Sequence, residues 1–214
     1  MAKLLEGKQV TAALKEKQQA AVAALATKGV TPTLGIIRVG EREDDIAYER
    51  GASKRCESVG VAVKYFHLPA HIPQEKLLSL IEQVNQDPSI HGVLLFRPLP
   101  KHIDDEVVRN ALAPEKDIDG ITDGSLAGVF TGSKKGFAPC TAQACLEILD
   151  HYGYNLKGKR VTVIGRSLVV GRPVAMMLME RNATVTICHT RTVNMPAVCR
   201  NAEILIVPAG KAKV

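Results

Sequence analysis

Residues 160–173 read RVTVIGRSLVVGRP, an apolar strand pattern followed at once by a glycine-bearing turn and the start of a helix. Such a turn exposes backbone N–H groups, and the helix dipole adds partial positive charge, so it can bind a phosphate group. The segment is not the GxGxxG fingerprint, because Ser167 stands where the second glycine would be and Gly171 follows Gly165 by six residues. A plain strand-to-helix turn that needs glycine is the alternative.

The next expected strand bears on the choice of cofactor. A site for NAD places Asp or Glu at the end of this strand, on the ribose hydroxyls. Here the strand over 183–188 ends in His189, Thr190 and Arg191, with no carboxylate. A basic and hydroxyl-bearing set suits a 2′-phosphate, and Arg166 in the preceding turn is placed to reach the same group. The sequence therefore favours NADP over NAD, with a merely solvated Arg191 as the alternative.

Outward from this segment, short apolar strands alternate with helical patterns along most of the chain. Alternation of this kind predicts βαβ units with parallel sheets, an α/β fold. The expected strands are 34–39, 61–68, 91–96, 160–164, 183–188 and 203–207, and the expected helices are 10–25, 44–58, 73–86, 104–112, 141–152, 169–181 and 193–199. The glycine-rich stretch over 113–140 is expected to be irregular, and such segments are usually functional or linkers.

Two α/β domains, 1–140 and 141–214, are the simplest division. The second shows three strands before the sequence stops at Val214. Doubly wound nucleotide-binding domains usually have five or six strands. We therefore expect a Rossmann-like domain that is incomplete at its C-terminus, with a fragment and a true short form both open.

The composition narrows the classes of function. No apolar run approaches the roughly 18 residues of a membrane helix, and the first residues lack the apolar region of a secretory signal, so we expect a cytoplasmic protein. With 4% aromatic residues and no Trp, a stacking platform for nucleic acid is not indicated, while a net charge of +6 suits an anionic small molecule. Five scattered cysteines and six scattered histidines indicate no metal site. The cysteines are expected to be reduced and mostly buried.

Several ordered motifs carry a resemblance to one enzyme family. They are Val39-Gly40 followed by the Tyr48 segment, Cys56-Glu57 with Val59-Gly60, His91-Gly92-Val93-Leu94, Pro98-Leu99-Pro100, Pro114 to Gly120, Pro139-Cys140-Thr141, Gly165 to Ser167 with Val170 to Pro173, Ala183 to Thr186 with Cys188-His189, and Ala202 to Val207. Each is weak alone, but their order and spacing over essentially all of the chain are specific. The chain resembles the methylenetetrahydrofolate dehydrogenase/methenyltetrahydrofolate cyclohydrolase family, enzymes of one-carbon metabolism and purine biosynthesis.

The resemblance implies a folate-binding catalytic domain, an NADP-binding domain, tetrahydrofolate derivatives as substrates and a homodimer formed through the second domain. The pterin is expected near Tyr48, Asp119 and the turn Pro98-Leu99-Pro100, with Tyr48 and Asp119 as the catalytic-site residues. Asp119 matches the carboxylate that holds the pterin, whose 2-amino/N3 edge offers two parallel donors. A loop cap before Gly120 is the alternative role for Asp119, and an ordinary core residue is the alternative for Tyr48. The implied cofactor site comprises Gly165, Arg166, Ser167, Gly171, Pro173, His189, Thr190 and Arg191.

Two family positions are changed together. The family's Tyr-x-x-x-Lys motif supplies the lysine of the cyclohydrolase step, but the residue four after Tyr48 is Ala52. The family's Gln that tunes this lysine is replaced by Phe96, and the following Arg97 is expected to offer a cation to the pterin or to the glutamate tail. On an ideal helix Arg55 returns to within about 20° of Tyr48, whereas nearby Lys54 lies roughly 120° away. Arginine stays protonated and cannot replace a lysine as a base.

Three functions stay open at this stage. The first is NADP-dependent oxidation of 5,10-methylenetetrahydrofolate to the 5,10-methenyl form, with weak or absent cyclohydrolase activity. Hydride transfer needs alignment and exclusion of water but no protein base. The second is a bifunctional enzyme that gives 10-formyltetrahydrofolate, with Lys54 or Arg55 partly replacing the lysine. The third is a non-catalytic folate or nucleotide binder.

Overall fold

The computed structural model describes residues 2–133 and 135–210, which fall into two compact units. The N-terminal unit is Thr11–Asp123, and the C-terminal unit comprises the described residues of Met1–Val10 and Gly124–Val214. The units change over between Asp123 and Gly124, while the domain division at residue 140 stays a prediction. Both units are α/β with parallel sheets, as the alternation of strands and helices predicted.

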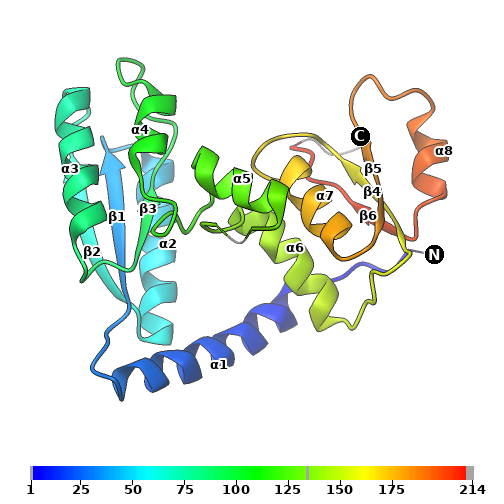
Figure 1. Ribbon diagram of the computed structural model, residues 1–214, viewed down its shortest axis with the longest axis horizontal. Helices are drawn as coiled ribbons and strands as arrows, with labels where there is room; N and C mark the ends of the chain where they lie inside the picture. The colour runs from blue at the N-terminus through cyan, green and yellow to red at the C-terminus, as the bar shows by residue number, and fades with distance from the viewer. Residues whose placement is uncertain (1, 134, 211–214) are drawn as a thin grey trace. The chain divides into compact units, whose positions relative to one another are not determined.

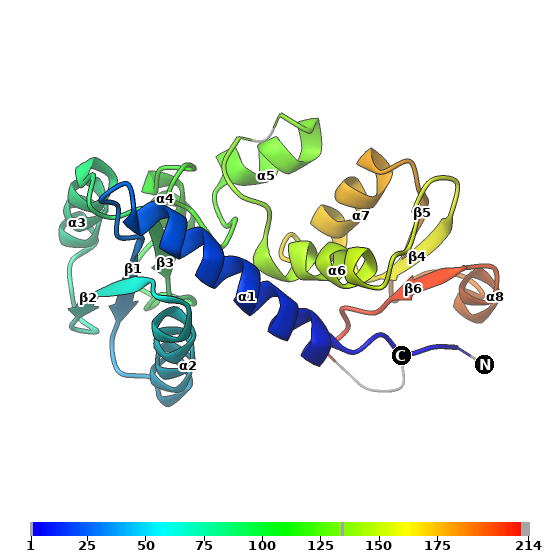
Figure 2. The same ribbon diagram turned by 90° about the horizontal axis from the view of Figure 1, so that it is seen from below.

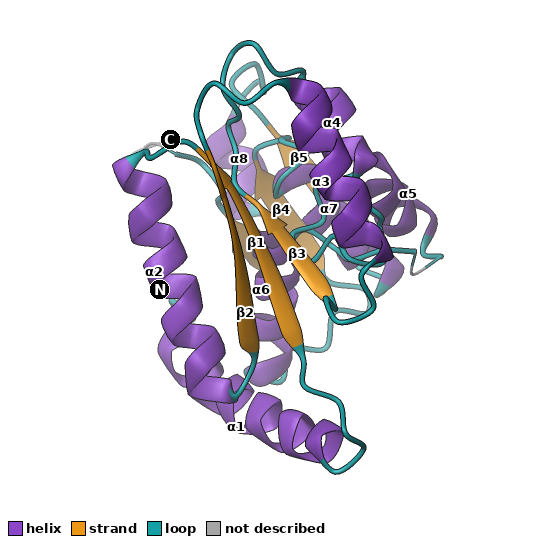
Figure 3. Ribbon diagram, turned by 90° about the vertical axis from the view of Figure 1, so that its left-hand side faces the viewer, coloured by secondary structure: helices purple, strands orange, loops and turns teal. Residues whose placement is uncertain are grey.

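The N-terminal unit contains a three-stranded parallel sheet in the order β2-β1-β3. The elements along this part of the chain are α1 Gly7–Ala26, β1 Thr33–Val39, α2 Glu43–Val59, β2 Ala62–Leu68, α3 Gln74–Gln86, β3 Gly92–Leu95 and α4 Asp105–Ala111 (Figure 1). Figure 3 shows α2 on one face of this sheet and α3 and α4 on the other. The two faces are therefore covered by different helices.

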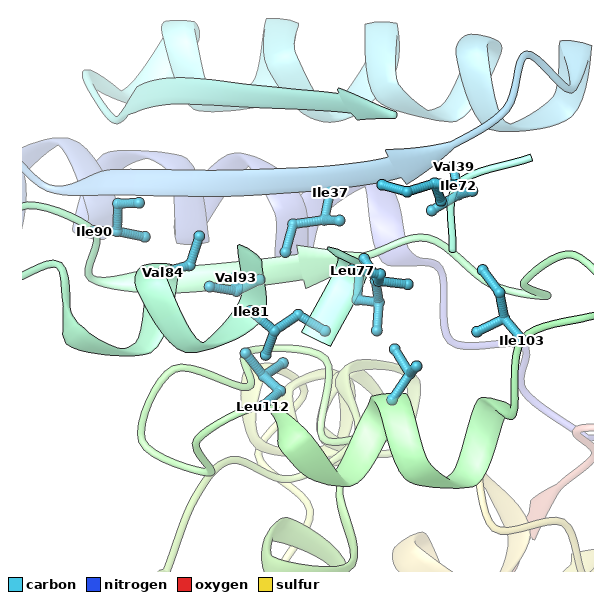
Figure 4. Packing of buried hydrophobic residues seen from close by; sticks show 12 residues of the cluster. Ile37, Val39, Ile72, Leu77, Ile81, Val84, Ile90, Val93, Ile103 and Leu112 are labelled. Carbon is cyan, nitrogen blue, oxygen red and sulfur yellow. The ribbon is translucent and has the colours of Figure 1, made fainter. Parts of the chain in front are cut away.

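Successive residues of β1 point to opposite faces of the sheet. Ile37 and Val39 enter the larger apolar cluster, which includes Leu77 and Ile81 of α3 (Figure 4). Ile36 and its neighbour Leu34 enter a smaller cluster on the α2 side. Because Ile36 and Ile37 are both fully buried, β1 is covered on both faces, as a central parallel strand requires.

The C-terminal unit has a parallel sheet in the order β5-β4-β6. The elements from residue 123 onward are α5 Asp123–Thr131, α6 Cys140–His151, β4 Arg160–Ile164, α7 Gly171–Glu180, β5 Thr184–Cys188, α8 Met195–Arg200 and β6 Ile204–Ile206. Residues of α6, α7 and β4 share one apolar cluster, and Figures 1 and 2 show α7 and α8 on opposite sides of the strands. This is the two-sided covering of a Rossmann-like sheet.

One expectation about secondary structure is wrong. The stretch 113–140 is not wholly irregular, because it contains α5, Asp123–Thr131. Two of its glycines are required by close packing: a Cβ on Gly128 would lie 2.0 Å from the carbonyl oxygen of Lys135, and one on Gly136 would lie 2.4 Å from Ser125 Oγ. The other expected helices and strands are present, with ends that move by no more than three residues.

The cysteines also differ from expectation. All five are described, and only Cys188 is buried, whereas Cys140 is exposed at the start of α6. Burial raises the pKa of the Cys56, Cys145 and Cys188 thiols. Within residues 2–133 and 135–210, no three His, Cys, Asp or Glu side chains are grouped to hold a metal ion. No helix in that same part of the chain has both the length and the hydropathy to cross a membrane.

Candidate active site

An exposed aromatic ring stands at the end of the N-terminal sheet. Tyr48 lies in the second turn of α2 and is 62% exposed. Its ring meets the ring of Phe96 edge-on, with centroids 5.6 Å apart and planes at 83°. Phe96 follows β3 directly and is buried. An edge-to-face pair is worth roughly 0.5–1.5 kcal/mol beyond the buried area. Phe96 therefore supports one edge of Tyr48, which stays largely open to solvent.

The two positions where the family resemblance implied Lys and Gln belong to one apolar cluster. Phe96 is a buried member of the cluster formed with Leu34, Ile36 and Leu94. Ala52 of α2 is partly buried and packs against the same cluster. Neither side chain carries a group that can donate, accept or transfer a proton. Ala52 and Phe96 are therefore apolar side chains in apolar surroundings.

The two cations that follow Ala52 in sequence, Lys54 and Arg55, have other surroundings. Lys54 lines a groove of about 520 Å³ between α2 and β2, on the side of α2 that turns away from Tyr48. Arg55 donates to Gln18 Oε1 of α1 at 2.8 Å. Arg55 is therefore bound to α1, and Lys54 points to a different face of α2 from the one that carries Tyr48.

The turn after β3 carries an ion pair that the sequence did not reveal. Arg97 Nε donates to Asp105 Oδ1 at 2.6 Å, and a second donor of the guanidinium reaches the other carboxylate oxygen. Hydrogen bonding to Asp105 raises the pKa of Arg97, with smaller contributions from the charges of Asp119 and Asp117, and Arg97 in turn lowers the pKa of Asp105. The peptide between Arg97 and Pro98 is cis. The Arg97 cation is thus held by the start of α4, within electrostatic range of Asp119.

The remainder of this turn is divided between core and surface. Leu99 is partly buried and packs against the larger apolar cluster, whereas Pro98 is exposed and Pro100 is partly buried. The turn is therefore fixed at Leu99 and open at Pro98. The role of all three in substrate binding stays a prediction.

Two aspartates of the Pro114–Gly120 motif have different surroundings. Asp117 is fully buried, pairs with Val93 in an isolated parallel bridge, and accepts from the backbone N–H groups of Ile121 at 3.1 Å and Thr122 at 2.8 Å. Asp119, two residues later, is only partly buried. Asp117 therefore caps the loop before α5, which is the structural role considered for Asp119. The sequence did not show that Asp117 is buried and accepts these hydrogen bonds, because sequence alone does not distinguish the two carboxylates.

The glycine-bearing turn of the C-terminal unit is held tightly against α7. Gly165 has a φ of +136°, and its N–H donates to the Cys188 carbonyl at 2.8 Å, which joins the ends of β4 and β5. Ser167 Oγ accepts from Val170 N at 3.2 Å. A Cβ on Gly171 would lie 2.2 Å from the Gly165 carbonyl oxygen, so only glycine fits there. The turn therefore has the close strand-to-helix approach of a phosphate-binding loop.

The segment after β5 forms a short turn beside this loop. His189 N donates to Thr192 Oγ1 at 2.8 Å, and His189 Nδ1 accepts from Arg191 N at 3.1 Å. Thr190 and Arg191 are exposed, as is Arg166 in the neighbouring loop. The structure thus brings the basic and hydroxyl side chains to the carboxyl ends of β4 and β5. Pro173, by contrast, is buried in the first turn of α7, where its missing N–H costs little.

The sequence-predicted residues form two groups, one in each unit. The N-terminal group is Tyr48, Arg97, Pro98, Leu99, Pro100 and Asp119, and the C-terminal group is Gly165, Arg166, Ser167, Gly171, Pro173, His189, Thr190 and Arg191. Sequence reasoning missed Asp105 and Asp117. The only available signal for Asp105 was its position in the first turn of an expected helix, which gives no partner.

Comparisons with known proteins match both units. The protein-family model for the tetrahydrofolate dehydrogenase/cyclohydrolase catalytic domain matches residues 5–119. The protein-family model for the NAD(P)-binding domain of the same enzymes matches residues 139–214. The bifunctional protein FolD of Carboxydothermus hydrogenoformans is 49% identical over 214 residues, which are 100% of this chain and 75% of that protein. FolD of Clostridioides difficile is 46% identical over 211 residues, which are 99% and 74% of the two chains.

Solved structures agree in fold. The bifunctional FolD from Campylobacter jejuni superposes with a TM-score of 0.92 at 36% identity, over 97% of this chain and 74% of that one. The Trypanosoma brucei dehydrogenase-cyclohydrolase, solved with NADP cofactor and an inhibitor, gives a TM-score of 0.87 at 32% identity, over 98% and 72% of the two chains. The arrangement of elements described above is thus that of these proteins.

Proposed function

Because the chain belongs to the tetrahydrofolate dehydrogenase/cyclohydrolase family, we propose that it oxidises 5,10-methylenetetrahydrofolate to the 5,10-methenyl form with NADP, and that its cyclohydrolase activity is weak or absent. The observation that carries the second part is the apolar cluster shared by Ala52 and Phe96. The reaction removes a hydride from the bridging carbon of the substrate and leaves a delocalised cation. No proton has to be taken by the protein in this step.

The C-terminal unit supplies groups that suit the cofactor. The loop packs so closely against the start of α7 that a Cβ at Gly171 would meet the Gly165 carbonyl oxygen. The N-terminus of a helix behind such a turn favours an anionic group. Arg166, Thr190 and Arg191 are exposed at the same sheet edge and suit a 2′-phosphate. Bound NADP would supply the acceptor for the hydride. The preference for NADP over NAD rests on this basic set and on the NADP complex of the Trypanosoma brucei relative.

The N-terminal unit supplies groups that suit the pterin. The exposed ring of Tyr48, supported by Phe96, offers a flat surface for a pterin face. Asp119 is partly buried near the positive charge of Arg97, and its carboxylate can accept two parallel hydrogen bonds from the 2-amino/N3 edge. The bound Asp105 limits how freely Arg97 can turn toward a substrate. Arg97 therefore acts on the substrate mainly through its charge.

Hydrolysis of the methenyl product makes different demands. A water molecule must be activated at the cationic carbon, and a proton must then be moved. A positioned acid or base typically contributes 10²–10⁴-fold to such a step. Ala52 and Phe96 offer no titratable group, Lys54 lines the groove between α2 and β2, and Arg55 is bound to Gln18. The chain should therefore release much of its product as the methenyl form.

The experiment is a coupled assay on the purified chain. With 5,10-methylenetetrahydrofolate and NADP, we expect NADPH and the methenyl product to be formed in equal amounts, each measured separately. Folate binding without NADPH formation would support a non-catalytic binder, and methenyl product that never accumulates would support the bifunctional alternative. The homodimer through the C-terminal unit stays a prediction, which light scattering on the same sample tests.

A further inference from the structure

A charged cluster holds α2 on a face of the helix next to the one that carries Tyr48. Arg38 of β1 and His67 of β2 are directly paired in the register of the parallel sheet. Both reach the carboxylate of Glu49 on α2: Arg38 Nε donates to Oε2 at 3.0 Å, and His67 Nε2 lies 3.0 Å from each oxygen. The side chains of Arg38 and Glu49 are only 9% and 12% exposed, while that of His67 is 48% exposed. Two strands and one helix therefore converge on one partly buried carboxylate.

The same arginine also joins the helix to the turn that precedes it. Arg38 Nη1 donates to the carbonyl oxygen of Gly40, immediately after β1. Gly40 has a φ of +84°, and its own N–H donates to the Leu68 carbonyl at the end of β2. Arg38 therefore binds both the turn into α2 and the second turn of α2 itself. This fixes where the helix begins and how it is rotated over the sheet.

Apolar packing gives α2 little other support. Of its 17 residues, all of them described, only Asp45 and Val59 are buried. Ala52 and Cys56 are partly buried against the small cluster under the helix. A helix with so few buried apolar side chains depends more on polar contacts for its position. Besides Glu49, Ser53 Oγ accepts from Tyr65 Oη of β2 at 2.8 Å, and Arg55 donates to Gln18 of α1 at 2.8 Å. The contact between Glu49 and Arg38 is thus a main determinant of the helix position.

We propose that Arg38 and Glu49 are positioning residues of the folate site, which act through Tyr48. Tyr48 precedes Glu49 in α2, and about 100° of rotation separates the two side chains around the helix axis. With Glu49 bound to the sheet, the Tyr48 ring is brought to the edge of Phe96 and its open face is presented to the pterin. This inference rests on the proposed function. In this proposal, the Arg38–Glu49 contact lies outside the candidate active site but fixes the position of the Tyr48 ring inside it.

The test separates position from stability by changing the partners one at a time and together. Glu49→Leu leaves a buried guanidinium without its carboxylate, which is strongly destabilising, whereas Arg38→Met with Glu49→Leu removes both charges and is often tolerated. We expect the double variant to fold and to raise the KM for methylenetetrahydrofolate on the order of 10-fold, because Tyr48 is no longer fixed. The KM for NADP should stay at the wild-type value. Glu49→Gln keeps the side-chain shape and one oxygen that can accept from Arg38. Its KM for folate should therefore be close to that of the wild type.

A readout without substrate makes the result independent of the proposed function. The Tyr48 ring resonance, assigned by its loss in Tyr48→Phe, carries the ring-current shift of Phe96 and should move toward the free-tyrosine position in the double variant. Lys64→Met, which removes an exposed ion pair with Asp87 in the same unit, is the matched control and should change neither KM nor the resonance. Inactive wild-type protein would contradict the proposed function, while the resonance would still decide the inference.

A folded double variant with wild-type folate KM and an unmoved Tyr48 resonance would overturn the proposal. If the double variant does not fold, Glu49→Gln and Arg38→Lys take its place. Lysine keeps the charge of Arg38 but cannot reach both Glu49 and the Gly40 carbonyl with one compact ammonium. We expect Arg38→Lys to raise the folate KM more than Glu49→Gln does. Wild-type folate KM in both of these single variants would equally overturn it.

Discussion

Gly171→Ala is expected to damage the cofactor site through a backbone clash. The added Cβ would lie 2.2 Å from the Gly165 carbonyl oxygen, 2.6 Å from its carbonyl carbon and 2.8 Å from Arg166 N. All three atoms are backbone, so no side-chain rotation relieves the contact. Ordinary van der Waals contact needs a shift of roughly 1 Å between the loop and α7, and overpacking of this kind typically costs about 1–3 kcal/mol.

We expect this cost to fall on cofactor binding as well as on stability. If about 1.4 kcal/mol of this cost is expressed as lost NADP affinity, the Kd for NADP rises about 10-fold. Folate affinity should not change, because Tyr48 and Asp119 belong to the other unit. Isothermal titration with NADP, together with thermal unfolding, measures both effects.

The matched control for this prediction is Gly51→Ala in α2. A Cβ on Gly51 has nothing within 4 Å, and the residue is inside a helix. Alanine there should stabilise the chain by about 0.5–1 kcal/mol, the helix-interior difference between the two residues. The reasoning is refuted if Gly171→Ala binds NADP as tightly as wild type with no loss of thermal stability.

Three further predictions address other parts of the site. Asp119→Ala should raise the Kd for folate by roughly 10-fold or more, the scale of a lost charge-assisted hydrogen-bond pair, and leave NADP affinity unchanged; titration with each ligand checks this. Arg191→Ala should weaken NADP more than NAD, and equal losses for both cofactors would remove the 2′-phosphate assignment. Arg97→Met should cost about 1 kcal/mol or less at neutral pH, because the pair with Asp105 is partly exposed. Since Arg97 lowers the pKa of Asp105, that contribution is present above the unfolded pKa near 3.9 and is lost as the pH falls through the lower folded pKa, so denaturant unfolding of the two proteins should converge in acid.

The order of helices and strands was predictable because each strand is a short apolar run between helical patterns. β1 illustrates this, since six of its seven residues are buried. The helix α5 was not predictable, because glycine normally breaks a helix, and Gly128 is instead required by the approach of the Lys135 carbonyl. Such a contact joins residues across a turn and has no signature in local composition.

The candidate site could be predicted at positions where the backbone conformation admits only one residue type. Gly165 and Gly171 could be assigned to a turn because few other residues fit such a conformation. Asp117 and Asp119 could not be distinguished, since burial decides between a cap and a ligand-binding carboxylate. Arg38 stood alone within an apolar strand, which signals a buried partner, but Glu49 is identified only by the position of α2 over the sheet.

Changes at residues 52 and 96 test the central claim that a catalytic lysine and its glutamine partner are missing. The Ala52→Lys, Phe96→Gln double variant places a titratable group and a polar partner in the cluster that now holds Ala52 and Phe96. Ala52→Met with Phe96→Leu is the matched control, because it alters size without adding a titratable group. The added lysine, with its amide partner, should accelerate hydrolysis of the methenyl form, and the apolar control should not.

The most direct measurement is the rate at which 5,10-methenyltetrahydrofolate is lost in the presence of the wild-type chain, compared with its spontaneous hydrolysis and with the rate of NADPH formation. We expect hydrolysis close to the spontaneous rate and far below the rate of oxidation, since acid–base help worth about 10²–10⁴-fold is missing. Hydrolysis should be faster in the Ala52→Lys, Phe96→Gln variant. Wild-type hydrolysis as fast as oxidation would contradict this expectation and would show that another residue performs the step.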